Sequence, residues 1–357
     1  MRKIGILTFQ FPENKNFGAS LQAYACLNLI KKFTKNVKLI NYYLNDYNIP
    51  LIKKIRLNLE SKNFIEYNKN FLNLTRKIKT DENLDFLNKE FDIFIVGSDQ
   101  VWRPKWLKEK VKHYFLDFVD INKKKIAYAA SFGTDNWEGE EKLTEEVKTL
   151  IKRFNSISVR EESGINICKE TFEIDNAVCV LDPTLMISKE DYQPILDDWK
   201  DKSHLSKKYI AHMLLDDSEK LKNESQNIAN YLKADINYIK GKYKKILWKN
   251  YFAYNKVSQW LTYLKDAELV ITDSFHCTVF SLIFHKKFVV VANLTRGIAR
   301  LETLLEKVGL KERFFTNIED VMKSGILDKE IDYNEVDKKL EIYRKYSMEF
   351  LKKALED

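Results

Sequence analysis

The sequence is poor in cysteine, and no apolar run is long enough to cross a membrane. Its four cysteines, at positions 26, 168, 179 and 277, show no CxxC spacing. Four scattered thiols in a chain of 357 residues do not resemble the disulfide framework of a small secreted domain. No stretch approaches the ~18 consecutive apolar residues of a transmembrane helix. We therefore expect a protein of a reducing cytoplasm that meets a membrane only at its periphery, on the inner face.

Signals for export, for a metal and for a dinucleotide are also missing. The amino terminus passes from an expected strand at 4–9 directly into charged residues at 13–15, which is too polar for a signal peptide. No His, Cys, Asp or Glu cluster has metal-ligand spacing. No GxGxxG follows the first strand, so a dinucleotide is not indicated. We expect neither a cofactor nor a metal, and no recognisable nucleic-acid module is present.

The chain is long and moderately basic. Its 60 Lys and Arg against 52 Asp and Glu leave a net charge of +8, which favours an anionic ligand or an anionic membrane surface. A solvated basic surface would produce the same balance. At 357 residues the chain exceeds what one hydrophobic core supports, so we expect two domains.

Apolar runs of strand length alternate with helical periodicity along most of the chain, which predicts parallel βαβ units. We place an amino-terminal Rossmann-like domain at 1–190, with a helical insertion at 45–90. A second Rossmann-like domain follows at 205–330, and a long amphipathic helix at 331–357 packs across a domain surface. The polar segment 197–202 marks the domain boundary.

Residues 268–293 contain the clearest such unit. A β-branched strand at 269–271 runs into Thr272, Asp273 and Ser274, and a helix begins near His276. Ligands bind at the carboxyl ends of parallel strands, and a helix start attracts anions, so Ser274, Phe275 and His276 are candidate site residues. The alternative for His276 is an ordinary core histidine.

Other polar residues follow predicted strands at the same expected edge. Asp99 suits a base for a hydroxyl proton, although it could simply cap a helix. Arg160 suits a bidentate anion contact, or else a surface ion pair. The remaining candidates are anion contacts at Gly18 and Ser131, and acceptor contacts at Asn16, Gln100 and Trp102. Gly18 could instead only relieve a tight turn.

Two basic segments allow more than one interpretation. The apolar and basic faces of 45–90 could rest on an anionic bilayer or form a helical lid on their own domain. In 240–254, lysines alternate with aromatic residues. We expect a loop there that faces an anionic acceptor, or a solvated flap, rather than a nucleic-acid platform.

Six stretches in register resemble the polysaccharide pyruvyl transferase family. They are FGASLQAYA (17–25), FDIFIVGSDQVW (91–102), KIAYAASFG (125–133), SVREESG (158–164), VLDPTL (180–185) and DAELVITDSFHCTVFSLIF (266–284). The resemblance implies a GT-B-like pair of Rossmann-like domains facing across a cleft. It also implies transfer of a carboxyvinyl unit from phosphoenolpyruvate to sugar hydroxyls as a ketal, with release of phosphate.

The resemblance also implies roles for single residues. Arg160 matches an arginine that holds phosphoenolpyruvate, and His276 matches the histidine of the carboxy-terminal motif. Better-understood members carry Arg two residues before that histidine, where this chain has Ser274, and many have Gly at the position of Cys277. Arg300, Arg296 or a lysine of 240–249 would have to supply the missing charge, or the donor differs.

The mechanism that follows is general acid and base catalysis, in which one residue protonates the donor and another deprotonates the acceptor. His276 protonates the methylene carbon of phosphoenolpyruvate, and Asp99 accepts the proton of an acceptor hydroxyl. The acceptor is a sugar of a surface polysaccharide or of its lipid-linked precursor. Two alternatives are a glycosyltransferase with a nucleotide-sugar donor and a non-catalytic sugar- or anion-binding relative. The sequence leaves the oligomeric state open.

Overall fold

The computed structural model describes residues 2–43, 50–201, 206–216, 218–246 and 249–356. The chain divides into two compact units. Unit 1 contains residues 1–54, 65–187 and 342–357, and unit 2 contains residues 55–64 and 188–341. The division at 187–188 lies earlier than the polar segment at 197–202 that we expected to mark it. Residues 45–49 of the expected helical insertion lie outside the described residues.

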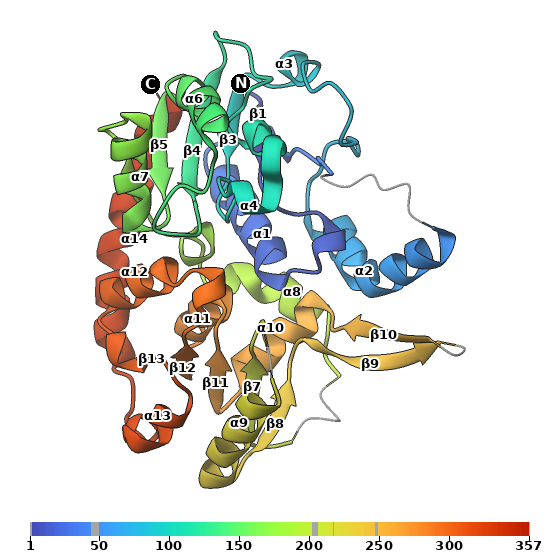
Figure 1. Ribbon diagram of the computed structural model, residues 1–357, viewed down its shortest axis with the longest axis vertical. Coiled ribbons are helices and arrows are strands. Elements are labelled where there is room, and N and C mark those ends of the chain that lie inside the picture. Colours follow the sequence, from blue (N-terminus) through green and yellow to red (C-terminus); the bar gives the residue numbers. More distant parts are fainter. Residues whose placement is uncertain (1, 44–49, 202–205, 217, 247–248, 357) are drawn as a thin grey trace. The chain divides into compact units, whose positions relative to one another are not determined.

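Unit 1 is built on a six-stranded sheet with the strand order β2-β1-β3-β4-β5-β6, and its strands pair in parallel (Figure 1). The strands are β1 (Ile4–Leu7), β2 (Val37–Leu39), β3 (Ile93–Val96), β4 (Lys124–Ala130), β5 (Ser156–Val159) and β6 (Val178–Cys179). Its helices are α1 (Phe17–Lys31), α3 (Leu87–Glu90), α4 (Pro104–Leu107), α5 (Val111–Tyr114), α6 (Glu141–Ile151) and α7 (Glu162–Phe172). Buried strand residues on both faces explain why these strands read as continuous apolar runs.

Unit 2 has a five-stranded parallel sheet with the strand order β13-β12-β11-β7-β8. Its strands are β7 (Tyr209–Met213), β8 (Asp235–Tyr238), β11 (Leu269–Thr272), β12 (Lys287–Val291) and β13 (Phe314–Phe315). Its helices are α8 (Gln193–Asp197), α9 (Glu219–Leu232), α10 (Val257–Asp266), α11 (Phe275–Ile283), α12 (Ala299–Val308) and α13 (Glu319–Lys323). The two parallel sheets confirm the α/β prediction of two Rossmann-like domains.

Residues 240–254 are not the loop that we expected. They form an antiparallel hairpin of β9 (Gly241–Ile246) and β10 (Lys249–Tyr254). Lys242, Tyr243 and Lys244 alternate with the period of two that a strand has, so that the two lysines lie on one face of β9 and Tyr243 lies on the other. The pattern therefore carried a strand signal that we interpreted as a loop.

Two long helices are shared between the units. Helix α2 (Leu51–Phe71) places residues 55–64 in unit 2 and its two ends in unit 1. Helix α14 (Tyr333–Glu356) begins in unit 2, and its residues from 342 onward belong to unit 1. In unit 1, the Ser347 hydroxyl accepts a hydrogen bond from the Leu181 amide at 3.0 Å, which ties α14 to the end of β6. No helix in the described part of the chain has the length and apolar character that crossing a membrane requires.

Candidate functional site

The strand order of unit 1 reverses between β1 and β3, which is where an open parallel sheet forms its ligand crevice. At that point the Thr8 hydroxyl donates to the carbonyl of Ser98 at 2.6 Å. Gly97 permits this approach, because a Cβ there would lie 2.9 Å from the Cβ of Thr8. The sequence thus brings the ends of β1 and β3 into close contact at the edge where we expected the site.

Arg160, just after β5, lies in a buried ion-pair network. Its Nη1 is 2.8 Å from Oδ2 of Asp182, and its Nη2 is 3.6 Å from Oδ1 of Asp99. Burial acts to lower the pKa of Arg160, and the carboxylates of Asp182, Asp99 and Glu161 outweigh it, so that the pKa is raised. We expected this guanidinium to face an open anion site or a surface partner. Its side chain is instead only 1% exposed, and it holds carboxylates of its own unit.

Asp99 follows β3 with a positive φ of 83°. Its Oδ1 accepts a hydrogen bond from the amide of Gln100 at 2.8 Å. Its Oδ2 is buried and accepts no hydrogen bond from the described residues. A buried carboxylate oxygen with spare accepting capacity can take a proton from a hydroxyl, which keeps Asp99 a candidate base.

The small-residue loop after β4 already binds a carboxylate. Oε1 of Glu161 accepts hydrogen bonds from the Ser131 hydroxyl at 3.0 Å and from the amides of Phe132 and Gly133 at 2.8 and 3.1 Å. Glu161 is fully buried. Ser131, which we predicted as a donor contact, therefore binds an internal anion in this structure.

Two predicted acceptor contacts differ from expectation. Trp102 is fully buried and stacks on Phe115 with ring centroids 4.8 Å apart, so its faces cannot serve a sugar. Oε1 of Gln100 accepts hydrogen bonds from Nη1 of Arg103 at 3.0 Å and from Nε1 of Trp106 at 3.1 Å. Trp106 is the aromatic residue that is exposed here, at 48%.

The remaining predicted site residues of unit 1, Asn16 and Gly18, lie at the start of α1. Asn16 is its N-cap, and the Asn16 Oδ1 accepts a hydrogen bond from the amide of Ala19 at 3.1 Å. Gly18 lies inside the first turn of the helix with a negative φ, and it is buried. The turn-relief alternative for Gly18 is therefore wrong, because the residue is helical. Asn16 itself is exposed.

In unit 2 the strand order reverses between β7 and β11, and Asp273 lies at that point. Its Oδ1 accepts from the amide of Leu215 at 2.8 Å, and its Oδ2 accepts from Nδ2 of Asn293 at 2.7 Å. Burial raises the pKa of the Asp273 carboxyl, against the hydrogen bonds, which act to lower it. Asp273 thus joins the carboxyl ends of β7, β11 and β12.

The same amide of Asn293 continues the network to a cation. Its Nδ2 also donates to Oδ2 of Asp216 at 3.0 Å, and Asp216 holds Arg296 through two hydrogen bonds of 2.9 and 2.7 Å. The bond from Arg296 holds the pKa of the Asp216 carboxyl well below its usual range. Arg300, at the start of α12, donates from Nη2 to the carbonyl of Arg296 at 3.1 Å. The carboxyl edge of this sheet therefore carries Arg296 and Arg300, the two arginines that we named as possible sources of the missing charge.

His276 occupies the first turn of α11. It is 6% exposed, and the Phe275 ring meets its imidazole edge to face with centroids 5.2 Å apart. Ser274 is the N-cap residue, and its amide donates to the Thr272 hydroxyl at 2.9 Å. The positive end of the helix dipole therefore lies at Ser274–His276, as the strand-to-helix pattern predicts.

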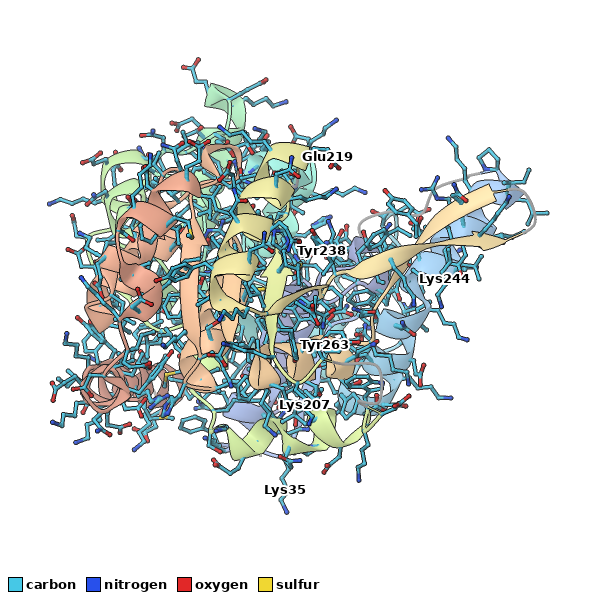
Figure 2. The ribbon with its side chains drawn as sticks, turned by 90° about the horizontal axis from the view of Figure 1, so that it is seen from below. Lys35, Lys207, Glu219, Tyr238, Lys244 and Tyr263 are labelled. Atoms are coloured by element: carbon cyan, nitrogen blue, oxygen red, sulfur yellow. The ribbon has the colours of Figure 1, made fainter. Side chains whose placement is uncertain are left out.

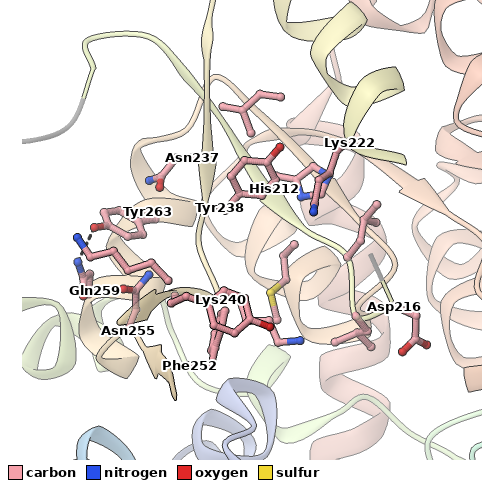
Figure 3. A pocket seen from close by; sticks show the side chains of 17 residues that line it. His212, Asp216, Lys222, Asn237, Tyr238, Lys240, Phe252, Asn255, Gln259 and Tyr263 are labelled. Atoms are coloured by element: carbon pink, nitrogen blue, oxygen red, sulfur yellow. Dashed lines mark hydrogen bonds between the residues drawn. The ribbon is translucent and has the colours of Figure 1, made fainter. Parts of the chain in front are cut away.

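A cavity of about 920 Å³ lies beside β7 and β8 in the same unit (Figure 3). Tyr238, Tyr263 and the amide side chains of Asn237 and Gln259 line it, together with residues of the hairpin base. Nδ2 of Asn237 is buried and donates no hydrogen bond to the described residues. Lys222, Lys240 and Lys242 give this cavity a positive lining, against the single carboxylate of Asp216. Such a mixture suits a polar, anionic ligand with a flat ring.

A family model described as polysaccharide pyruvyl transferase matches residues 16–295. The chain belongs to the polysaccharide pyruvyl transferase family. Membership supports a transferase that acts in polysaccharide modification, with a polysaccharide or sugar as acceptor. No curated protein matches the chain in sequence.

Solved structures show the fold of this family member. The UDP-GlcNAc 2-epimerase of Methanocaldococcus jannaschii has a TM-score of 0.56 and 16% identity, over 92% of this chain and 93% of that one. S. aureus MnaA, solved with UDP, has a TM-score of 0.55 and 11% identity, over 94% and 91%. At these identities the likeness concerns the fold alone, which is that of GT-B glycosyltransferases and related epimerases.

Sequence reasoning missed three site residues, Asp216, Asp273 and Asn293. Each lies within three residues of the end of a strand, and we named Asp273 only as a helix cap. The signal that would have found them is the shared position of β7, β11 and β12 ends at one sheet edge.

Proposed function

We propose that this pyruvyl transferase family member uses phosphoenolpyruvate as donor and forms a ketal on a sugar of a surface polysaccharide or its lipid-linked precursor. Membership of the family over residues 16–295 supports the reaction class. The observation that carries the donor assignment is the buried His276 in the first turn of α11. An imidazole at a helix start lies beside a region that favours anions, and phosphoenolpyruvate is an anion.

The first step is protonation of the donor. An imidazole can act as a general acid, which suits His276 to deliver a proton to the methylene carbon. The adjacent carbon then becomes electrophilic. An acceptor hydroxyl attacks it, a C–O bond forms, and the hydroxyl proton passes to Asp99.

The second step closes the ketal. The C–O bond to the phosphate breaks, and phosphate leaves with the bonding electrons. A second hydroxyl attacks the same carbon and passes its proton to His276, and the proton held by Asp99 leaves with the phosphate. The overall change is phosphoenolpyruvate plus a diol giving a cyclic ketal plus phosphate. In unit 2, Arg296, Arg300 and the dipole of α11 supply the positive charge that steadies the donor's carboxylate and the leaving phosphate. Arg160, held among its own carboxylates, positions Asp99 instead of the donor.

The experiment has a binding arm and a turnover arm. Thermal melts with phosphoenolpyruvate, inorganic phosphate and UDP-GlcNAc report the donor, since a ligand at about 100 times its Kd stabilises by roughly 2.7 kcal/mol. We expect phosphoenolpyruvate to raise the Tm and Arg300→Gln to weaken the shift. With glycan from the source cells, ³¹P NMR should show phosphate release that His276→Gln lowers at least about a hundredfold.

His285 provides the matched control, because it follows the same helix at its other end and is exposed beside Asp337. His285→Gln should keep wild-type turnover. Normal turnover in His276→Gln would remove His276 from the acid role.

A second candidate function has its own observation. The cavity beside β7 and β8 combines flat rings, amides and lysines, which also suits a nucleotide-sugar. The structural likeness to MnaA, solved with UDP, adds support at the level of the fold. Stabilisation by UDP-GlcNAc and not by phosphoenolpyruvate would favour a glycosyltransferase.

A further inference from the structure

Two segments hold the excess positive charge of this chain. Residues 50–59 and 239–256 together contain nine Lys and Arg and no Asp or Glu. The whole chain carries a net charge of +8, so everything outside these two segments carries a net charge of −1. Both segments are therefore locally basic, and a local excess of positive charge indicates a surface that meets a negative partner.

The first segment begins α2 and exposes large aliphatic side chains. Leu51, Ile52 and Ile55 are 72%, 61% and 50% exposed. Their spacings of three and four residues place them on one face of the helix. Lys53, Lys54 and Arg56 lie among them, and Arg56 pairs with Glu60 at 2.8 Å. The first turns of α2 therefore combine three exposed aliphatic side chains on one face with flanking cations, the two features by which a helix binds an anionic lipid surface.

The second segment is the hairpin β9–β10. Tyr243 is 76% exposed, and its ring packs edge to face on Phe252 with centroids 5.1 Å apart. Lys242, Lys244 and Lys245 are also exposed. An exposed tyrosine between lysines is the residue type that settles at the level of lipid headgroups.

Contacts within unit 2 hold the hairpin against α2. Nδ2 of Asn63 donates to the carbonyl of Tyr254 at 2.8 Å, and the rings of Phe64 and Tyr254 lie 6.0 Å apart. Figure 2 shows the hairpin, labelled at Lys244, extending beside α2. Residues 55–64 of α2 and the hairpin therefore form one surface of unit 2, and the same helix continues to Ile52 and Leu51. We call the two basic segments together the basic face.

We propose that the basic face docks on a bilayer that contains anionic phospholipid. The lysines supply attraction to the headgroups, and Leu51, Ile52 and Ile55 enter the boundary of the acyl region. Nucleic acid would match the charge and the tyrosine, but it offers nothing to three exposed aliphatic side chains. A second copy of this chain would bring the same positive face, which repels itself.

Vesicle flotation with the full chain tests this, with phosphatidylcholine alone and phosphatidylcholine mixed with phosphatidylglycerol. We expect binding only to the mixed vesicles, and weaker binding as salt rises. Lys244→Gln with Lys245→Gln should lower the partition coefficient roughly thirtyfold. Ile52→Ser with Ile55→Ser should lower it roughly tenfold or more.

The matched control is Lys35→Gln with Lys207→Gln, which removes the same charge from exposed positions on other elements (Figure 2). It should change binding less than about twofold. Equal binding to both vesicle types, or an equal loss in the control, would overturn the proposal. Two other results, in a protein that does not bind vesicles, would also overturn the proposal. One is a dimer that dissociates in the Ile52→Ser, Ile55→Ser variant, and the other is RNA binding that depends on Lys244 and Lys245. This readout does not depend on pyruvyl transfer.

Discussion

Replacing Arg160 by methionine should destabilise unit 1 by about 4 kcal/mol, because removing one partner of a buried ion pair leaves an uncompensated charge. Methionine keeps most of the packing of the stem and removes the guanidinium. Asp182 would still accept hydrogen bonds from the Ser98 hydroxyl at 2.7 Å and from the Thr184 amide at 3.0 Å. Those bonds hold the loss to the middle of the roughly 3–5 kcal/mol that such truncations cost. Asp99 also loses the charge that lies 3.6 Å away.

A double-mutant cycle with Asp182→Asn separates the pair from its surroundings. Asparagine keeps an accepting oxygen and removes the charge, so Arg160→Met with Asp182→Asn leaves no unpaired member of the pair. The double variant should lose less than the sum of the two single variants, with a coupling energy of roughly 1–3 kcal/mol.

Urea unfolding followed by tryptophan fluorescence is the assay, fitted with two transitions because the chain has two units. Trp102 in unit 1 and Trp260 in unit 2 are both buried and report on their own units. Arg76→Met is the control, since Arg76 pairs with Glu82 at the surface and should cost about 0–1 kcal/mol. Additive single variants, or an Arg160→Met variant as stable as that control, would refute the structural role of the pair.

Two further predictions concern buried groups of the two units. Asp99→Asn should lower the free energy of unfolding by about 1 kcal/mol and turnover by at least about a hundredfold. Asp99→Ala should lower the free energy of unfolding by roughly 1 kcal/mol more, because φ is positive at this position. Phosphate release and urea unfolding check both, and wild-type turnover in Asp99→Asn would exclude the base role. Burial raises the pKa of the Cys26, Cys168 and Cys277 thiols to about 12. A disulfide reagent at mildly alkaline pH should therefore label fewer than one thiol per native chain on average and all four after unfolding, and rapid native labelling of Cys26 or Cys277 would contradict their burial.

The sequence was informative where a local pattern sets the structure. Continuous apolar runs predicted the strands at 4–9 and 269–271, which the structure shows as β1 and β11, because parallel strands are buried on both faces. The position after a strand correctly predicted that polar residues gather at one edge of each sheet. It could not predict the direction of a side chain. Trp102 follows β3 as Asp99 does, yet it turns into the core and stacks on Phe115.

Pairing between distant residues explains the other differences. Arg160 and Asp182 are 22 positions apart, and only the neighbouring positions of β5 and β6 bring them together. Glu161 likewise reaches the loop after β4 and accepts a hydrogen bond from the Ser131 hydroxyl, which we assigned to an external anion. In both cases a charged residue with a plausible external role binds an internal partner. A single sequence does not distinguish those two outcomes, since both need the same residue types.

The replacement of the family arginine by Ser274 does not remove positive charge from the site edge of unit 2. From Asp273, directly before Ser274, a chain of hydrogen bonds runs through Asn293 to Asp216 and from there to Arg296, with links of 2.7, 3.0 and 2.7 Å. Asp216 is 49% exposed at this edge, so an arriving anion competes with one accessible carboxylate for Arg296. The surface pair costs little to exchange, because exposed ion pairs contribute roughly 0–1 kcal/mol. A donor carboxylate or phosphate can therefore take Arg296 from Asp216, and we propose this arginine as the cation that compensates for Ser274.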